Sequence, residues 1–83
     1  MKRLGVVGIV VENRVENAPK VNSVLTEFGD IILGRLGLPN KDKGANVIAL
    51  IVEGTNDDFG ALTGKLGAIK GVSVCSALSK EEK

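Results

Sequence analysis

Hydrophobic positions along the chain switch several times between strand-like and helix-like patterns. Residues 4–12 (LGVVGIVVE) are β-branched and glycine-rich, with apolar side chains at both odd and even positions, which predicts a strand covered on both faces. Residues 46–53 (NVIALIVE) repeat this pattern. Residues 31–38 (IILGRLGL) predict another strand, and residues 72–78 (VSVCSAL) alternate like a last one.

The segment between the first two predicted strands has helical spacing. Asn17 is placed to cap a helix whose first turn contains Pro19, and Gly29 and Asp30 would end it. Its apolar positions are Val21, Val24, Leu25 and Phe28.

A second helix is predicted before the last strand. Thr55 or Asn56 can cap it, and Asp57 and Asp58 follow where the positive end of the helix dipole favours carboxylates. Its apolar stripe comprises Phe59, Leu62, Leu66 and Ile69.

The second helix also carries three glycines along one side, Gly60, Gly64 and Gly67. Each costs roughly 0.5–1 kcal/mol relative to alanine in a helix interior. Either the helix closely approaches its neighbour or another subunit there, or it is a mobile helix that tightens when a ligand binds.

The predicted element order is strand, helix, strand, strand, helix, strand. For a chain of 83 residues, this order indicates an α+β, ferredoxin-like βαββαβ sandwich with a four-stranded antiparallel sheet and both helices on one face. Pro39 and the NKDKG segment would connect the second and third strands as a hairpin. We expect one domain over residues 1–83, of which residues 79–83 form a frayed tail.

Two helices can cover only one face of such a sheet, yet two of the strands are apolar on both. The first strand offers Val6, Gly8 and Val10 against Val7, Ile9 and Val11, and the third offers Val47, Ala49 and Ile51 against Ile48, Leu50 and Val52. The open face should therefore expose several hundred Å² of apolar surface, a size typical of an interface. We expect a homo-oligomer, a dimer or tetramer, that packs sheet on sheet or extends the sheet edge to edge. The alternative is that these residues are only strand formers on an exposed face.

Charge and composition argue against several classes of function. The 11 basic and 10 acidic side chains leave a net charge of +1, so nothing draws the chain generally towards nucleic acid or anionic membranes. Phe28 and Phe59 are the only aromatic residues and belong to helix stripes, so the strands lack the stacking platforms of RNA-recognition domains. No apolar run reaches the roughly 18 residues of a membrane span. Since the single Cys75 cannot close an intramolecular disulfide, we expect a cytoplasmic protein.

Few residues could carry catalysis or bind a metal. The chain has no histidine and no second cysteine to activate Cys75 or to share a metal with it, so Cys75 is expected to be a small buried hydrophobe. Asp57 and Asp58 are better explained as helix-start residues than as metal ligands. We therefore expect no enzyme, no catalytic residue, no metal and no cofactor.

Two groups of residues could instead hold an anion. Arg14, with Asn13 and Asn17, lies beside the predicted N-terminus of the first helix, where free amide groups favour negative charge; the alternative is an ordinary solvated loop. Arg35 and Gly37 lie in the second strand, an edge of a ferredoxin-like sheet. There, Arg35 is either a solvated residue that discourages strand pairing or a contact to an anion or a subunit, and the glycine permits close approach.

A resemblance to a known family is carried by three segments, LGVVGIVVENR, VNSVLTEFGDIILGRLGLP and NVIALIVEGTNDDFGALTGKLGAIKGVSV. Over nearly the whole chain they resemble the small family of proposed regulators of the iron-only hydrogenase system, and ILGRLGLP and IALIVEGTND are the most specific parts. That family is similar to ACT-type small-molecule sensing domains and to the C-terminal domain of the nickel-responsive repressor. The resemblance implies an oligomeric, ACT-like regulatory domain.

The resemblance transfers only a few residues. ACT domains often bind their ligand at a subunit interface, near an Asn/Asp-Arg-Pro-Gly turn after the first strand. Asn13 and Arg14 match this turn, but Val15 and Glu16 stand in place of Pro-Gly. The nickel-responsive repressor binds its metal through histidines and a cysteine, and a chain without histidine cannot form that site.

Together, the residues and the resemblance predict a non-enzymatic regulatory domain. The resemblance implies regulation of the iron-only hydrogenase system, at the level of transcription, by an oligomer that senses a small anionic or amino-acid-like ligand. We expect this ligand at a subunit interface; the candidate binding residues are Asn13, Arg14, Asn17, Arg35 and Gly37. The alternative is a purely structural oligomerisation or protein-interaction module without a ligand. Since the chain has no helix-turn-helix or ribbon-helix-helix segment, it is not expected to bind DNA alone.

Overall fold

The computed structural model describes residues 1–40 and 42–80. Its strands are β1 (Arg3–Val11), β2 (Ile32–Asn40), β3 (Ala45–Gly54) and β4 (Val72–Leu78). Its helices are α1 (Arg14–Glu27) and α2 (Asn56–Gly67), and a short 3-10 helix, η1 (Gly29–Ile31), leads into β2. The predicted ferredoxin-like βαββαβ fold is confirmed.

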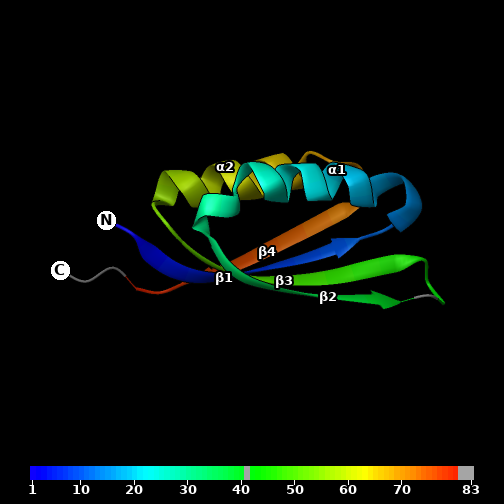
Figure 1. The fold of residues 1–83 in the computed structure, drawn as a ribbon, viewed down its shortest axis with the longest axis horizontal. Helices are drawn as coiled ribbons and strands as arrows, with labels where there is room; N and C mark the ends of the chain where they lie inside the picture. The colour runs from blue at the N-terminus through cyan, green and yellow to red at the C-terminus, as the bar shows by residue number, and fades with distance from the viewer. Residues whose placement is uncertain (41, 81–83) are drawn as a thin grey trace.

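The strands lie in the order β2-β3-β1-β4, so the apolar strands β1 and β3 are central and β2 and β4 form the edges. Both helices lie on one side of the sheet, and no described element covers the other side (Figure 1). All neighbouring strands are antiparallel. The shape is elongated, with extents of 45 × 18 × 18 Å.

The core lies between the helices and the sheet face that they cover, here called the helix-covered face. The strands contribute Val7, Ile9, Val11, Ile48, Leu50, Val52 and Val72, and the helices contribute Val21, Leu25, Phe59, Leu62 and Leu66. Because each such side chain gains roughly 1.5–3 kcal/mol on burial, this largely aliphatic layer is the main source of stability within one chain.

The opposite side of the sheet is here called the open face. From β2 to β4, its three central rows read Leu36–Ala49–Gly8–Cys75, Leu38–Val47–Val10–Ser73 and Gly34–Ile51–Val6–Ala77. The predicted apolar open face is confirmed, since its large side chains remain between 41% and 62% exposed. Cys75 belongs to this face and is exposed. The prediction of a buried Cys75 is therefore wrong, because pairing with Gly8 turns the cysteine away from the helices.

Strand β2 does not alternate regularly. Its pairing with β3 shifts between Ile32 and Gly34, which leaves Leu33 in a bulge. Ile32 consequently lies opposite Val52 on the helix-covered face, whereas Gly34 lies opposite Ile51 on the open face. With regular alternation, Ile32 would lie on the same face as Gly34. The bulge therefore moves Ile32 to the helix-covered face.

Strands β2 and β3 form the predicted hairpin, but with a shorter connection than expected. Pro39, predicted to begin the connection, lies within β2 opposite Asn46, and Asn40 lies opposite Ala45. Residue 41 of the predicted connection lies outside the described residues.

Helix α1 begins one turn earlier than predicted. Asn13 is its N-cap, with a left-handed φ of 52°, whereas Asn17, the predicted cap, lies inside the helix and is only 5% exposed. The Asn17 side-chain amide donates to the backbone carbonyls of Glu12 (2.7 Å) and Lys70 (3.0 Å). The side chain thus ties α1 to the ends of two other segments instead of capping its own helix, and Pro19 lies within the helix rather than in its first turn.

Helix α2 begins as predicted. The Thr55 hydroxyl accepts from the Asp58 N–H (3.1 Å), and the Asp58 carboxylate accepts from the Thr55 N–H (2.9 Å), which is a capping box. By contrast, Gly60, Gly64 and Gly67 are exposed, and a Cβ at any of them would meet nothing within 4 Å. The predicted close approach is therefore wrong within this chain.

The segment that follows β4 is held to β1 by its first residue, Ser79. The Ser79 N–H donates to the Leu4 carbonyl (2.7 Å), and the Ser79 carbonyl accepts from Arg3 Nε (2.9 Å). Ser79, the first residue of the predicted frayed tail, is thus hydrogen-bonded to β1. Residues 81–83 of that tail lie outside the described residues. Among the helices of the described chain, none is long and apolar enough to cross a membrane.

Candidate functional site

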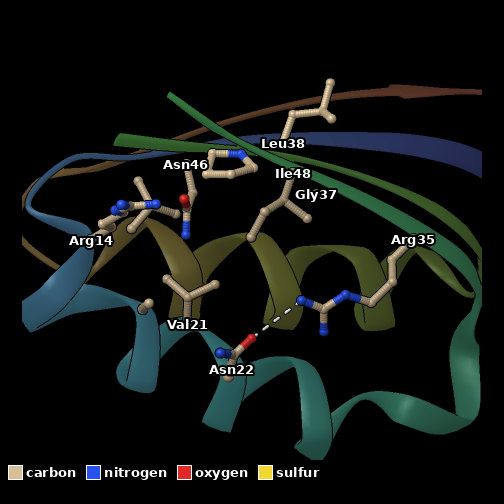
Figure 2. A pocket seen from close by; sticks show the side chains of 11 residues that line it. Arg14, Val21, Asn22, Arg35, Gly37, Leu38, Asn46 and Ile48 are labelled. Carbon is tan, nitrogen blue, oxygen red and sulfur yellow. Dashed lines mark hydrogen bonds between the residues drawn. The ribbon is translucent and has the colours of Figure 1, made fainter. Parts of the chain in front are cut away.

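A cavity of about 280 Å³ lies on the helix-covered side of the sheet, between α1 and the β2–β3 pair. We call it the α1–β2 cavity. It is lined by the polar residues Arg14, Asn22, Arg35 and Asn46 and by Val11, Ala18, Val21, Gly37, Leu38, Pro39 and Ile48 (Figure 2). Its volume is close to the lower end of the roughly 300–1,000 Å³ that is usual for small-molecule sites.

The two arginines reach the cavity from different elements. Arg14 is the first residue of α1, and its N–H donates to the Gly44 carbonyl (3.1 Å), which joins the start of the helix to the β2–β3 hairpin. Arg35 lies opposite Leu50 on β2, on the helix-covered face. Its Nη2 donates to Asn22 Oδ1 (3.2 Å), so the side chain reaches from the edge strand to α1 (Figure 2).

The lining of the cavity is positively charged. No acidic residue lines it, and neither Arg14 nor Arg35 has an acidic partner among the residues that the structure describes. A guanidinium group binds carboxylates and phosphates through paired, charge-assisted hydrogen bonds. The cavity is therefore suited to an anion.

Asn46 lines the same cavity and has a buried hydrogen-bond acceptor without a partner among the described residues. It lies on β3 at the parity of Ile48 and Leu50, and its Oδ1 is buried without a hydrogen-bond partner in the described part of the chain. Because a buried unpaired polar group costs roughly 1–3 kcal/mol, an occupant that donates a hydrogen bond to Oδ1 would be favoured. Sequence reasoning missed Asn46, although a polar residue at a core parity of an apolar strand was a usable signal.

The structure brings together three of the five predicted binding residues, Arg14, Arg35 and Gly37. Asn13 and Asn17 instead line a separate surface hollow of about 510 Å³. Its other lining residues are Glu12, Glu16, Lys20, Lys70 and Gly71. The charges there are mixed and the Asn17 amide is used for structure, so this hollow has less to offer an anion. Asn22 was not predicted, and nothing in the sequence distinguishes it from other exposed helix residues.

Asp58, weighed from the sequence as a metal ligand, belongs to the capping box of α2. Arg35 does not stand free at the sheet edge, because it donates a hydrogen bond to α1. Within residues 1–40 and 42–80, no three His, Cys, Asp or Glu side chains are grouped so that they could hold a metal ion.

Comparisons with known proteins place the chain among proteins of this fold. Residues 3–76 match the model of the TM1266-like family, described as a proposed iron-only hydrogenase system regulator. The structure of the uncharacterized protein TM1266 from Thermotoga maritima is 40% identical, with a TM-score of 0.92, and the match covers 96% of this chain and 100% of that one.

Two more distant structures share the fold alone. An unknown protein from Galdieria sulphuraria has 14% identity and a TM-score of 0.64, over 100% of this chain and 48% of that one. A formyltetrahydrofolate deformylase from Pseudomonas putida KT2440 has 11% identity and a TM-score of 0.63, over 89% of this chain and 28% of that one. No curated protein matches the chain.

Proposed function

The chain belongs to the TM1266-like family of proposed iron-only hydrogenase system regulators, and from this premise we propose that it is a non-enzymatic regulatory domain that responds to a small anion. The anion binds in the α1–β2 cavity. The observation that carries this proposal is a cavity lined by two arginines and, among residues 1–40 and 42–80, by no acidic side chain. The domain acts on transcription through a partner that binds DNA. We place it in the cytoplasm, with which its single unpaired cysteine is compatible.

The lining indicates the chemistry of the ligand. Arg14 and Arg35 would both attract a carboxylate into the cavity, an adjacent hydroxyl or amino group would donate to the unpaired Asn46 Oδ1, and a small apolar part would contact the aliphatic lining. Such a ligand contacts α1 and β2 at once. It can favour one position of α1 relative to β2 over another, and the size of this shift is limited by the difference in its affinity for the two positions.

A structural module without a ligand is the second candidate. The apolar open face favours it, since that face suits an assembly role whether or not the cavity is occupied. The α1–β2 cavity is formed within one chain, so the expected position of the ligand at a subunit interface stays a prediction.

The proposal is tested by titrating isotope-labelled protein with lactate, propionate and phosphate at constant ionic strength, with backbone amide NMR shifts as the readout. Lactate has both the carboxylate and the hydroxyl donor, so it should bind saturably and move the signals of Gly37 and Ile48. Propionate lacks the donor for Asn46 and should bind several-fold more weakly.

Variants locate the site. Arg14→Ala and Arg35→Ala should each weaken lactate binding about tenfold or more, because a charged hydrogen bond contributes roughly 1.5–3 kcal/mol. Asn46→Asp, which places a negative charge in the cavity, should abolish binding. Lys20→Ala removes a positive charge from the same helix outside the cavity and should leave binding unchanged. Absence of saturable shifts with all three anions, or an equal loss in Lys20→Ala, would refute the proposal.

A further inference from the structure

The open face is apolar across β2, β3 and β1, and β4 adds Ser73, Cys75 and Ala77. Leu36 and Leu38 are each 62% exposed, Val6 is 48% exposed and Ile51 is 45% exposed. Among the described strand residues on this face, Glu53 carries the only charge, at the end of the sheet where it pairs with Leu4. Monomers rarely leave so broad an apolar surface in water, and the cores of interfaces are depleted of charge in the same way.

The relief of the open face is uneven. On the edge strand β2, Leu36 and Leu38 stand up from the sheet, whereas the matching positions of the other edge strand, β4, are Cys75 and Ser73. A hollow of about 250 Å³ lies beside these short side chains, over Gly8, Val10, Val47, Ser73 and Cys75. A Cβ at Gly8 would meet only the Cys75 carbonyl oxygen, at 3.8 Å, so the hollow is not filled from within the chain.

We propose that the open face binds the open face of a second copy, about a two-fold axis that runs parallel to the strands between β3 and β1. Because the strand order is β2-β3-β1-β4, this axis lays β2 of each copy over β4 of the other. Leu36 and Leu38 then enter the hollow beside Cys75 of the partner subunit. An axis across the strands would set Leu36 on Leu36 and leave both hollows empty, so shape selects the first arrangement.

The size of the face is sufficient for a specific dimer. Strands about 4.8 Å apart, with a rise of about 3.3 Å per residue, give a face of about 19 by 29 Å. Two copies would therefore cover about 1,100 Å² even before the corrugation of the side chains is counted, which meets the roughly 1,000 Å² expected of a biological interface.

Pairing through the sheet edge at β2 is less favourable. The bulge at Leu33 interrupts the row of backbone groups, and Pro39 has no N–H to donate. The α1–β2 cavity lies on the other side of the sheet, so the face-to-face dimer neither requires a ligand nor blocks it.

Sedimentation equilibrium between 1 and about 100 μM tests the assembly. The wild type should show twice its mass of 8.6 kDa. Leu36→Asp places a charge in the interface twice and should raise the dimer dissociation constant at least about 100-fold. Val15→Asp, at a 91% exposed valine of α1, should not. A wild-type monomer throughout this range, as expected if the face serves another protein, would overturn the proposal, and so would equal effects of the two variants.

Gly8→Val tests whether the dimer depends on the shape of the open face or only on its apolar character. The substitution makes the face more apolar but fills the hollow, and the single chain has room for it. We expect it to weaken the dimer at least about tenfold. A dimer strengthened by Gly8→Val would contradict the proposed fit.

Disulfide trapping tests the axis. On oxidation with copper phenanthroline in air, Leu36→Cys should give a covalent dimer through Cys75 of the partner subunit, since disulfides bridge facing sheets at this spacing in immunoglobulin domains. The wild type and L36C/C75S should give none, because the two copies of each cysteine lie three strand spacings, about 14 Å, apart. Failure of the L36C dimer, or covalent dimers in either control, would overturn this arrangement.

Discussion

The two faces of the sheet are built from the same strands but differ in what completes them. On the helix-covered face, Val7, Ile9 and Leu50 are fully buried by α1 and α2, whereas their neighbours Val6 and Ile51 on the open face stay nearly half exposed. Alternation along an apolar strand thus creates two potential cores, and two helices complete only one. The covered side holds a cavity to which two arginines contribute, and the open side keeps an apolar surface exposed.

The two faces should differ most in how much a truncation lowers the free energy of unfolding, and neighbouring residues of β3 allow this comparison. Leu50→Ala removes a fully buried side chain and should lower the free energy of unfolding by about 2–5 kcal/mol. Ile51→Ala should lower it by less than about 1 kcal/mol in a chain kept monomeric by Leu36→Asp. Urea unfolding of both variants in that background checks the comparison, and equal losses would mean that the open face is covered within a single chain.

Two asparagines on the helix-covered side sharpen the comparison further. Asn17→Ala leaves the carbonyls of Glu12 and Lys70 without their donor and should cost about 1–3 kcal/mol. Asn46→Ala removes an acceptor that has no partner, so it should not lower ligand-free stability, because relief of the roughly 1–3 kcal/mol cost of the unpaired group offsets the packing that is lost. Thermal or urea unfolding distinguishes them. A large loss for Asn46→Ala would show that its side chain supports the fold and is not held ready for a ligand.

The smallest expected effect concerns the outer side of α2. Since a Cβ at Gly64 meets nothing within 4 Å, Gly64→Ala should stabilise the chain by about 0.5–1 kcal/mol through helix propensity. Urea unfolding at low and high protein concentration provides the measurement. Destabilisation that appears only at high protein concentration would show that a second chain also covers the outer side of α2. The open face would then not be the only surface that another chain covers.

Local signals in the sequence predicted most of the elements. The capping residue Thr55, with Asp58 three residues later, fixed the start of α2 because a capping box needs only adjacent residues. The start of α1 was misplaced because the Asn17 amide bonds to carbonyls of two other segments, one of them 53 residues away. A residue type that suits a cap can equally serve a long-range contact, and spacing does not distinguish the two.

The candidate site was predicted in pieces. Arg14 and Arg35 were separate candidates for anion binding, and the folding of β2 beside α1 placed them on one cavity with Asn46. Asn13 and Asn17 were grouped with Arg14 by proximity in the sequence, but they line a different hollow. Neighbours in sequence point in different directions from a helix start, so proximity along the chain does not define a pocket.

The sequence by itself determined the element order, the fold class and the excess of apolar strand surface, because these follow from hydrophobic period and from local capping and turn chemistry. Only the tertiary structure decided which parity of each strand the helices cover, where the β2 bulge reverses it, and that Cys75 lies on the open face. The physical reason is that register and facing depend on contacts between segments far apart in the chain, and a shift of one residue moves a side chain from one face to the other.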